Sequence, residues 1–490
     1  MYLLSGRKHL SVTLTFLMFV LLMSTAACSG GRVAQAPAEG RLFPVPKYIF
    51  LFIGDGMGPA QAGLAGAVLD SSSTLAMTGF PVLGTITTHA EDRYITDSGA
   101  AGTALATGSK TSVGTISMKS NHRDTLRTVA ELARRNGMRV GIVSSVGIDN
   151  ATPACFFAHN AKRTNYYDIA MQMASSGFDY FGGGYAEGDF PQNRLKGGVN
   201  RPDIPALMKS AGYRVVSDRS SLRSVLPGTK CWAYTGFDDK AAMSFEMDRK
   251  EQDISLAEFT REGIRLLDNP KGFFMMVEGG KIDWACHAND AAAAAHDVIA
   301  FDDAVREAVA FSRSHPVETL IVVTADHECG GLSLGNGRRG YDSRISLLHR
   351  QKVSLEMFTR KVAGWQASRN VSFSMALDSV KVYYGLGDVS ADSSLVLSGE
   401  ERLVLSKAYR EGSAKGAAGS ATSGNAEGFA SAVTAMLNAR AGIGWASNAH
   451  TAVPVQVFAE GAGSEVFGGY FDNTGIAGKL IRLARFGERR

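Results

Sequence analysis

Short, almost continuously apolar runs alternate with helical patterns along this chain, and this alternation constrains its fold more than any other feature. The runs are rich in β-branched and aromatic residues and cover residues 48–53, 139–144, 273–277, 319–324 and 453–459. Such runs are typical of parallel strands that are buried on both faces. Helical patterns lie between them, at residues 124–136, 255–267 and 290–313. We therefore predict an α/β fold with a doubly wound, mostly parallel central sheet and helices on both faces.

Two regions depart from this pattern. Residues 181–250 mix glycine, charge and short apolar pieces, with a small αβ unit around residues 209–216. Residues 335–445 have the character of an insertion, and the Ser/Gly/Ala-rich segment 412–428 within it is typical of a mobile linker or loop. A chain of this length can bury a large core as two domains or as one large α/β unit with insertions. We expect the second arrangement, with the main domain over residues 47–490.

The N-terminus has the pattern of an export signal. Arg7 and Lys8 precede an apolar run, residues 10–23, that is too short to span a membrane comfortably. Small residues at 24–27 then lead to Cys28, as in a bacterial lipoprotein cleavage box whose cysteine becomes lipidated. The pattern predicts an exported, periplasmic protein that is anchored to the membrane through Cys28.

One residue of this box leaves an alternative open. Thr25 stands where the box usually has an aliphatic residue, so simple signal-peptide cleavage also fits the sequence. Either way, we expect the signal peptide to cover residues 1–27 and a flexible tether to cover residues 28–46.

Charge and cysteine content limit the possible partners. Removing the signal's two basic residues from the 51 in the chain leaves 49, against 47 acidic residues. This near balance gives no reason to expect specific nucleic-acid binding. Four further cysteines follow Cys28, at positions too widely spaced for a disulfide scaffold or a C-x-x-C zinc site: Cys155, Cys231, Cys286 and Cys329. Their pairing cannot be read from the sequence.

The segment T-D-S-G-A-A-G-T-A at residues 96–104 places Ser98 at the start of a helix. Small residues leave no bulk near its hydroxyl, and the helix N-terminus favours an anion beside it. A serine in this position could attack a phosphoryl or acyl group if another group activated it. No G-x-S-x-G elbow surrounds Ser98. The alternative is a helix cap, which is the usual role of Thr, Asp and Ser before a helix.

Potential metal ligands flank several of the apolar runs: Asp55, Glu278, Asp283, His287, Asp326, His327 and His450. Asp283 and His287 are four residues apart and would share one face of a helix, which suits zinc. Each ligand also has an ordinary explanation, such as a turn at Asp55 or a structural role for the lone His450. However, a doubly wound sheet gathers the carboxyl ends of its strands at one edge. This convergence favours a metal site that could activate the serine.

A further candidate segment, D-N-A-T-P-A at residues 149–154, follows the run at 139–144. Thr152 can cap a helix that has Pro153 at its first position. A helix over residues 155–162 would then carry Arg163 to its end. An arginine fork suits two oxygens of a phosphate, although a surface arginine is the ordinary expectation.

Taken in order, these motifs closely resemble those of the alkaline phosphatase family. The matching segments are I-G-D-G-M-G at 53–58, T-D-S-G-A-A-G-T-A at 96–104, A-T-P-A at 151–154, A-H-N-A-K-R at 158–163, G-F-F-M-M-V-E-G at 272–279, I-D-W-A-C-H at 282–287, T-A-D-H-E at 324–328 and G-W-A-S-N-A-H-T at 444–451. The resemblance covers residues 47–340 and 440–475, and leaves out most of the insertion.

The resemblance implies a homodimer in which each subunit holds two Zn²⁺ and one Mg²⁺. The first zinc would be held by Asp283, His287 and His450; the second by Asp55, Asp326 and His327 with Ser98; and the third metal by Asp55, Thr152 and Glu278. Arg163 would hold the non-bridging oxygens of the phosphate. The implied reaction is hydrolysis of small phosphate monoesters through a phosphoserine on Ser98, which a metal ion activates in place of a histidine base.

Two positions depart from well-known members of the family. Asn150 stands where many have Asp or His, and Trp284 stands where many have Lys or His. Asn150 removes a negative charge beside the third metal, and Trp284 removes a cation linked to the phosphate. The identity of the third metal therefore does not follow from the resemblance.

Two other functions compete with the monoesterase. A phosphodiesterase or nucleotide pyrophosphatase of the same superfamily is disfavoured by Ser98 and Arg163, because those relatives often use threonine and bind oxygen differently. A phosphate-binding lipoprotein without turnover is disfavoured by the intact ligand set. A sulfatase lacks support because no C/S-x-P-x-R motif surrounds Ser98.

Overall fold

The computed structural model of the chain describes residues 44–487 except 71, 197, 369, 389–391 and 417–422. The expected signal peptide, Cys28 and the tether up to residue 43 lie outside the described residues. The described residues belong to one unit, Phe43–Arg490. None of the helices in this part of the chain combines the length and the apolar character needed to cross a membrane.

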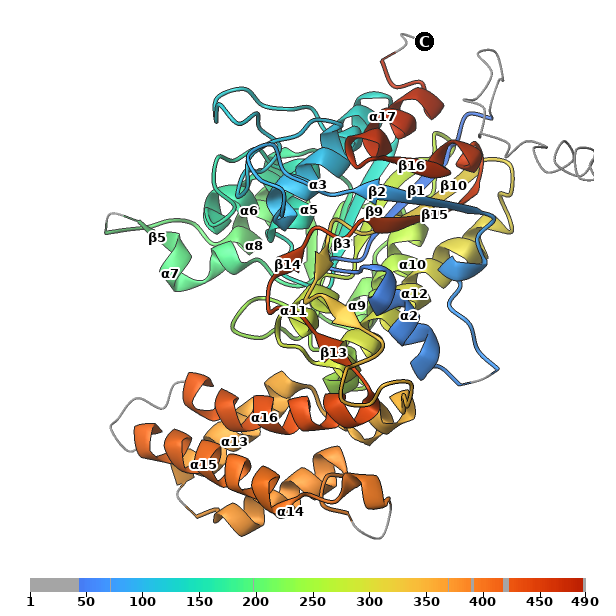
Figure 1. Cartoon of the computed structure of the whole chain (residues 1–490). Coiled ribbons are helices and arrows are strands. Elements are labelled where there is room, and N and C mark those ends of the chain that lie inside the picture. The colour runs from blue at the N-terminus through green and yellow to red at the C-terminus, as the bar shows by residue number, and fades with distance from the viewer. Residues whose placement is uncertain are drawn as a thin grey trace, which may run out of the picture. The chain divides into compact units, whose positions relative to one another are not determined.

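A ten-stranded, mostly parallel sheet forms the centre of this unit (Figure 1). Its strands, in spatial order, are β16 (Gly469–Asp472), β2 (Val82–Thr87), β15 (Val455–Gly461), β10 (Thr319–Thr324), β1 (Tyr48–Ile53), β9 (Phe273–Glu278), β3 (Arg139–Ser144), β4 (Tyr180–Gly183), β8 (Cys231–Tyr234) and β7 (Arg214–Val216). All pairings in this sheet are parallel except the two that β15 makes with β10 and β2. The predicted sheet is confirmed, and the last predicted strand begins two residues later, at Val455.

The central strands are apolar because helices cover both of their faces. Every residue of β1, β9 and β10 is buried, and Leu51 lies opposite Met276 on one side and Val322 on the other. Burying each such side chain contributes about 1.5–3 kcal/mol relative to leaving it in water. The same register brings the carboxyl ends of β10, β1, β9 and β3 side by side.

Helices pack in two groups around the sheet (Figure 1). One group contains α2 (Pro59–Val68), α10 (Leu256–Leu267), α11 (Lys281–His287) and α12 (Ala291–Ser312). The other contains α3 (Ser98–Thr107), α4 (Val129–Arg135), α5 (Ala151–Phe157) and α17 (Thr474–Leu483). The prediction of helices at 255–267 and 290–313 is confirmed. The helix predicted from residue 124 begins only at Val129, because Thr128 and Glu131 form a capping box that fixes its start.

The regions just before β4 and between β4 and β9 contain short elements at one edge of the sheet. They are α6 (Tyr166–Ser175), α7 (Pro191–Arg194), α8 (Ile204–Ser210), α9 (Arg219–Ser224) and the small hairpin of β5 (Leu195–Lys196) and β6 (Val199–Asn200). The expected αβ unit at 209–216 corresponds to the end of α8 followed by β7.

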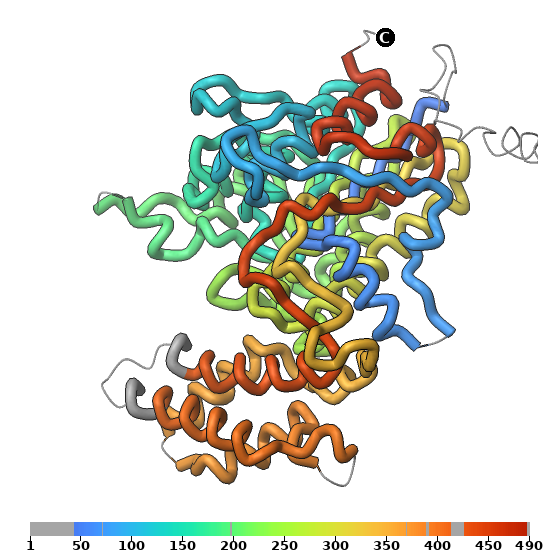
Figure 2. The backbone as a smooth tube through the Cα atoms, viewed as in Figure 1, coloured from blue at the N-terminus to red at the C-terminus, as the bar shows by residue number. Residues whose placement is uncertain are grey.

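The described part of the insertion contains four α-helices, which Figure 2 shows as a group of orange coils. They are α13 (Leu355–Ser368), α14 (Phe373–Tyr384), α15 (Gly399–Gly416) and α16 (Ser423–Ala441). Their apolar faces make a second core in which Phe358 and Phe429 join Leu64 of α2. The prediction of a linker over 412–428 is wrong for its described ends, 412–416 and 423–428, which are helical. Packing of α15 against α16 outweighs the low helix propensity of their Gly and Ser residues there.

Candidate active site

Each of three neighbouring strands has a candidate ligand at its carboxyl end or in the loop that follows. Asp55 follows β1, Asp326 follows β10, and Glu278 is the last residue of β9. Because these strands are parallel neighbours, their carboxyl ends meet at one edge of the sheet. All three carboxylates are buried there, as the convergence of strand ends predicts.

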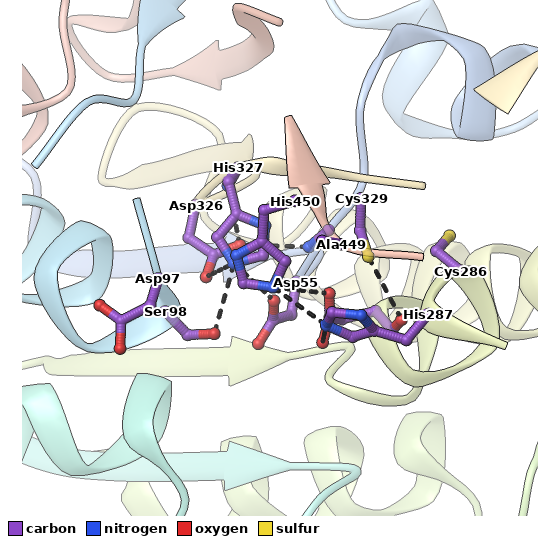
Figure 3. Close-up of polar contacts among 12 residues, drawn as sticks. Asp55, Asp97, Ser98, Cys286, His287, Asp326, His327, Cys329, Ala449 and His450 are labelled. Atoms are coloured by element: carbon purple, nitrogen blue, oxygen red, sulfur yellow. Dashed lines mark hydrogen bonds and ion pairs between the residues drawn. The ribbon is translucent and has the colours of Figure 1, made fainter. Parts of the chain in front are cut away.

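The buried cluster consists of Asp55, Asp326 and His327. All three side chains are buried. His327 Nε2 lies 3.4 Å from Asp55 Oδ1 and 3.2 Å from Asp326 Oδ2. Ser98 Oγ lies 3.3 Å from the same nitrogen (Figure 3). The structure therefore brings the candidate nucleophile to the three ligands that the resemblance implies for the second zinc.

Ser98 does not cap helix α3. Asp97 is the N-cap residue, and its carboxylate accepts a hydrogen bond of 2.9 Å from the amide of Ala100. Ser98 is the first residue of the helix, and its side chain is buried beside the buried cluster. The capping interpretation is wrong for Ser98, because its neighbour already takes that role.

The half-open cluster consists of Asp283, His287 and His450. His287 Nε2 lies 3.4 Å from Asp283 Oδ2 and 3.1 Å from His450 Nε2, and His450 Nε2 lies 3.5 Å from Asp283 Oδ1. Asp283 is buried, whereas the His287 side chain is 39% exposed. Helix α11 carries Asp283 and His287 on one face, as their four-residue spacing predicts.

Backbone carbonyls set the orientation of both imidazoles in the half-open cluster. His287 Nδ1 contacts the carbonyl of Asn448 at 2.6 Å, and His450 Nδ1 contacts the carbonyl of Thr96 at 2.9 Å. A carbonyl only accepts, so each Nδ1 donates a proton, and Nε2 is the nitrogen left to face a metal ion. This is the arrangement in which a histidine binds a metal ion through Nε2.

A short antiparallel pairing brings His450 to the site from the far end of the chain. β11 (Glu328–Cys329), directly after His327, pairs with β14 (His450–Thr451). The Glu328 carboxylate reinforces this pairing, because it accepts hydrogen bonds from the Thr451 hydroxyl and from Gln61 Nε2. Close by, β12 (Leu332–Ser333) and β13 (Gly444–Trp445) form a second such pair.

Gly56 allows the two clusters to approach each other. Its φ angle is +69°, a left-handed conformation that L side chains rarely adopt. A Cβ atom at this position would lie 2.9 Å from Asp283 Oδ1 and 3.0 Å from the Cβ atom of Cys329. A larger residue here would push Asp283 away from its histidine partners.

The predicted ligands of the third metal meet on the other side of Asp55. The Thr152 hydroxyl donates to Asp55 Oδ2 at 3.2 Å, and Ser144 donates to Glu278. Asn150, not Thr152, caps α5, with its side chain accepting from the amide of the next residue. The capping role considered for Thr152 is therefore wrong, and its hydroxyl is free to face the site.

Arg163 reaches the site from a loop rather than from a helix. α5 ends at Phe157, so the helix expected over 155–162 is wrong. Arg163 Nη1 donates to Asp97 Oδ2 at 2.9 Å, and Nη2 donates to Asn150 Oδ1 at 3.4 Å. Asp97 thus joins the start of α3, which carries the serine, to the guanidinium.

The buried carboxylates of the site lie close enough together to favour bound cations. Burial, followed by the charges of Asp326 and Asp283, raises the pKa of Asp55 well above its ordinary value. Burial likewise raises the pKa of Glu278 to about 7 and, together with the Asp283 charge, that of Asp326 to about 7. Burial would raise the pKa of Asp283 too. Its hydrogen bond to His450 and the neighbouring histidines outweigh burial, so the pKa of Asp283 is lowered. Buried carboxylates so close together repel one another unless a positive charge lies between them.

Several oxygens of these carboxylates accept no hydrogen bond, and these are Asp55 Oδ1, Glu278 Oε1, Asp283 Oδ1 and Asp326 Oδ2. Unpaired polar atoms in the interior are costly, so a buried set of this kind points to bound cations. Carboxylate oxygens and imidazole nitrogens are ligands that zinc accepts, and an all-oxygen set suits magnesium. The residues present therefore fit divalent metal ions.

Sequence reasoning missed three residues that shape the site. Asp97 orients Arg163, Glu328 fixes the β11–β14 pair, and the Cys329 sulfur lies among the ligand atoms of the half-open cluster, all within 4.8 Å of one another. Their only signal in the sequence is adjacency to Ser98 or His327. The cysteines Cys155, Cys231, Cys286 and Cys329 are all buried and free.

A doubly wound α/β sheet with a serine and two carboxylate–histidine clusters at its carboxyl edge defines a metal-dependent hydrolase. The model of the alkaline phosphatase family matches residues 46–486, and the chain belongs to this family. Its members are metal-dependent and hydrolyse phosphate esters.

Individual relatives agree with this assignment. The chain is 30% identical over 453 residues to alkaline phosphatase 4 of Bacillus subtilis, covering 90% of this chain and 89% of the relative. A cold-active alkaline phosphatase from Shewanella is similar in structure, with a TM-score of 0.73 and 28% identity over 89% of this chain and 99% of that one. A mutant of the TAB5 alkaline phosphatase, with magnesium in its M3 site, has a TM-score of 0.62 and 25% identity over 91% of this chain and 100% of that one.

Proposed function

We propose that this protein hydrolyses phosphate monoesters, with Ser98 as the nucleophile and a phosphoserine as the intermediate. The observation that carries this proposal is the position of the Ser98 hydroxyl, 3.3 Å from His327 Nε2 at the edge of the buried cluster. Burial and the His450 charge hold the pKa of His327 well below its ordinary value. His327 is therefore neutral, with a lone pair available for a ligand role.

We propose two zinc ions and one magnesium ion per subunit. The residues that would hold the first zinc are Asp283, His287 and His450; those for the second are Asp55, Asp326, His327 and Ser98; and those for magnesium are Asp55, Thr152 and Glu278. When bound, these ions supply positive charge that stabilises oxygen anions at the reacting centre.

Side chains of the protein carry out the attack and bind the phosphate. Ser98 Oγ gives up its proton to solvent and attacks phosphorus; the bond between phosphorus and the alcohol oxygen breaks, and the alcohol takes up a proton from solvent as it leaves. Water then hydrolyses the phosphoserine and restores Ser98. The Arg163 guanidinium has the fork geometry that holds two non-bridging phosphate oxygens, and Asp97 keeps that fork in place.

Two substrates and a chelator test this proposal. We expect rapid turnover of para-nitrophenyl phosphate, slow turnover of bis(para-nitrophenyl) phosphate, and loss of both activities in a chelator with recovery on adding zinc. Faster turnover of the bis-ester would support a phosphodiesterase instead. Binding of phosphate without turnover of either ester would support a phosphate-binding lipoprotein.

We also propose that the protein is exported to the periplasm, anchored through a lipid on Cys28, and active as a homodimer. The support for the anchor is the sequence pattern that ends at Cys28. Incorporation of labelled palmitate that Cys28→Ser abolishes would test the anchor. The mass of the purified protein in solution would test the dimer.

A further inference from the structure

A cavity of about 450 Å³ lies beside the half-open cluster and has no role in the proposed function so far. His287 and Trp284 of α11 form part of its lining. The insertion supplies another part through residues of α13 and α16, which include Leu355, Glu356, Thr359, Arg360 and Glu427. We call it the insertion cavity. It is large enough for a small organic group.

The insertion cavity lies on the side of the site towards which the alcohol part of the substrate leaves. This inference rests on the proposed function. Figure 3 shows Ser98 and His287 at opposite ends of the row of ligating side chains. In phosphoryl transfer the attacking and leaving oxygens are roughly in line on opposite sides of phosphorus. Attack by Ser98 therefore directs the alcohol towards the half-open cluster. His287, which belongs both to that cluster and to the cavity lining, connects the two.

The lining offers an aromatic face. Trp284 is partly exposed, and two lysine ammonium groups lie over its ring, with Lys240 Nζ 5.1 Å and Lys281 Nζ 4.6 Å from the ring centroid. Lys281 is buried, and its Nζ also lies 3.7 Å from the Phe245 ring centroid. These cation–π contacts fix the orientation of the indole. The exposed part of this fixed indole can contact a second aromatic ring, edge-to-face or offset.

The charges in the lining exclude a second anionic group. The acidic residues of the lining, Asp239, Asp290, Glu356 and Glu427, outnumber Lys240 and Arg360. Arg360 is already paired, because its Nη2 lies 3.0 Å from Glu356 Oε1 and 3.6 Å from Asp239 Oδ1. A leaving group that carried a carboxylate or another phosphate would meet this net negative charge.

We propose that the insertion cavity binds the alcohol part of the phosphate ester and selects uncharged alcohols that carry an aromatic ring. Trp284 provides the aromatic surface, and residues of the insertion and of the segment that contains Lys240 and Phe245 line other parts of the cavity. Helices α13 and α16 of the insertion thus help to set the preferred class of substrate for this enzyme.

Three phosphate esters test this selection in the metal-loaded protein: ethyl, 2-cyclohexylethyl and 2-phenylethyl phosphate. Their alcohols have similar acidity, so differences in kcat/KM report binding of the group rather than its ease of departure. We expect kcat/KM for the phenylethyl ester to exceed that for the ethyl ester about tenfold, and to exceed that for the cyclohexyl ester. Equal values for the ethyl and phenylethyl esters would overturn the proposal, and equal values for the two ring esters would overturn its aromatic class.

Trp284→Ala and a matched control locate the effect. We expect Trp284→Ala to lower the phenylethyl-to-ethyl ratio to about 2, because the aromatic surface is lost. Trp365→Ala removes a tryptophan that packs on Phe358 of the same insertion, outside the cavity lining, and should leave the ratio unchanged. An unchanged ratio in Trp284→Ala would contradict the proposal. Turnover of ethyl phosphate in the same preparations shows that each variant is folded.

Reversing the charge of Glu427 tests the role of the charged lining independently. Because Glu427 is exposed, the change should leave the fold intact. Wild-type protein should prefer 4-methylbenzyl phosphate to 4-carboxybenzyl phosphate, and Glu427→Lys should narrow that preference about threefold. No change would contradict the role given to the charged lining. Absence of turnover with every ester, ethyl phosphate included, would instead show that the proposed function itself is wrong.

Discussion

The buried and half-open clusters use the same two kinds of side chain but differ in how the chain builds them. Asp55, Asp326 and His327 come directly after central strands and are fully enclosed. The half-open cluster combines two residues of helix α11 with His450 from a short strand pair near the C-terminus. The edge of the central sheet therefore positions the buried cluster, which lies beside the nucleophile. Helix α11 and the β11–β14 pair position the half-open cluster, which lies on the side where the alcohol leaves.

The largest effect is expected in the buried cluster. Asp326→Asn should lower kcat for para-nitrophenyl phosphate by at least about a thousandfold, because a neutral amide neither balances a metal charge nor orients His327 as the carboxylate does. Steady-state kinetics and zinc content by elemental analysis check this. Asp303→Asn, at an aspartate whose side chain is 57% exposed, is the control and should behave like wild type. Near-normal activity in Asp326→Asn would remove the buried cluster from the mechanism.

A smaller loss is expected from Arg163, which Asp97 and Asn150 hold beside the start of α3. Arg163→Ala should lower kcat/KM about 10²-fold, because the phosphate loses a bidentate donor, and Arg163→Lys should recover only part of it. Asp97→Asn should produce a milder form of the same defect, since it frees the guanidinium that Asp97 now holds. Equal kinetics for wild type and Arg163→Ala would rule out the proposed contact.

His287→Gln should sharpen the contrast between the clusters. Because His287 is partly exposed, we expect zinc affinity at the half-open cluster to fall by about 10–100-fold, with activity restored by excess zinc. The same substitution at the enclosed His327 should resist such rescue. Zinc titrations of activity and of bound metal measure both. Equal rescue of the two variants would mean that the clusters do not differ as described.

The smallest expected effect is on stability in the absence of metal. Burial raises the pKa of Asp326 and Glu278 from 3.8 and 4.5 to about 7, so the folded chain holds protons that the unfolded chain releases. Their contribution to stability is therefore complete below pH 3.8 and is lost as the pH rises through 7.

Thermal unfolding in a chelator between pH 5 and 8 measures this loss. We expect Tm to fall by about 2–4 °C over that interval, with a flatter profile in Glu278→Gln and no fall when zinc is present. A Tm that rises with pH in the metal-free protein would contradict the assigned direction.

The sequence predicted the parts of this molecule that local patterns determine. Continuous apolar runs gave the central strands β1, β3, β9 and β10, and position at strand ends gave Asp55 and Asp326. The strands β2, β4 and β8, which are shorter or half-exposed, were not predicted. Capping was harder to predict, because Thr128 and Asn150 compete with several polar neighbours that could equally well begin a helix.

Contacts between residues far apart in the sequence determine the features that could not be predicted. His450 is a lone histidine in the sequence, and only the pairing of β14 with β11 places it beside Asp283. Arg163 faces the site because Asp97 binds it across a loop, not because a helix carries it there. The helices of the insertion depend on packing against one another, which the Gly- and Ser-rich sequence of 412–428 concealed.

Trapping the phosphoenzyme tests directly whether Ser98 is the nucleophile. Metal-loaded protein is mixed with a ³²P-labelled monoester, quenched in acid and digested, and the labelled peptide is identified by mass spectrometry. The account predicts one phosphoserine, at Ser98, and no labelled protein from Ser98→Ala. A label on another residue, or a labelled phosphoenzyme in Ser98→Ala, would contradict it.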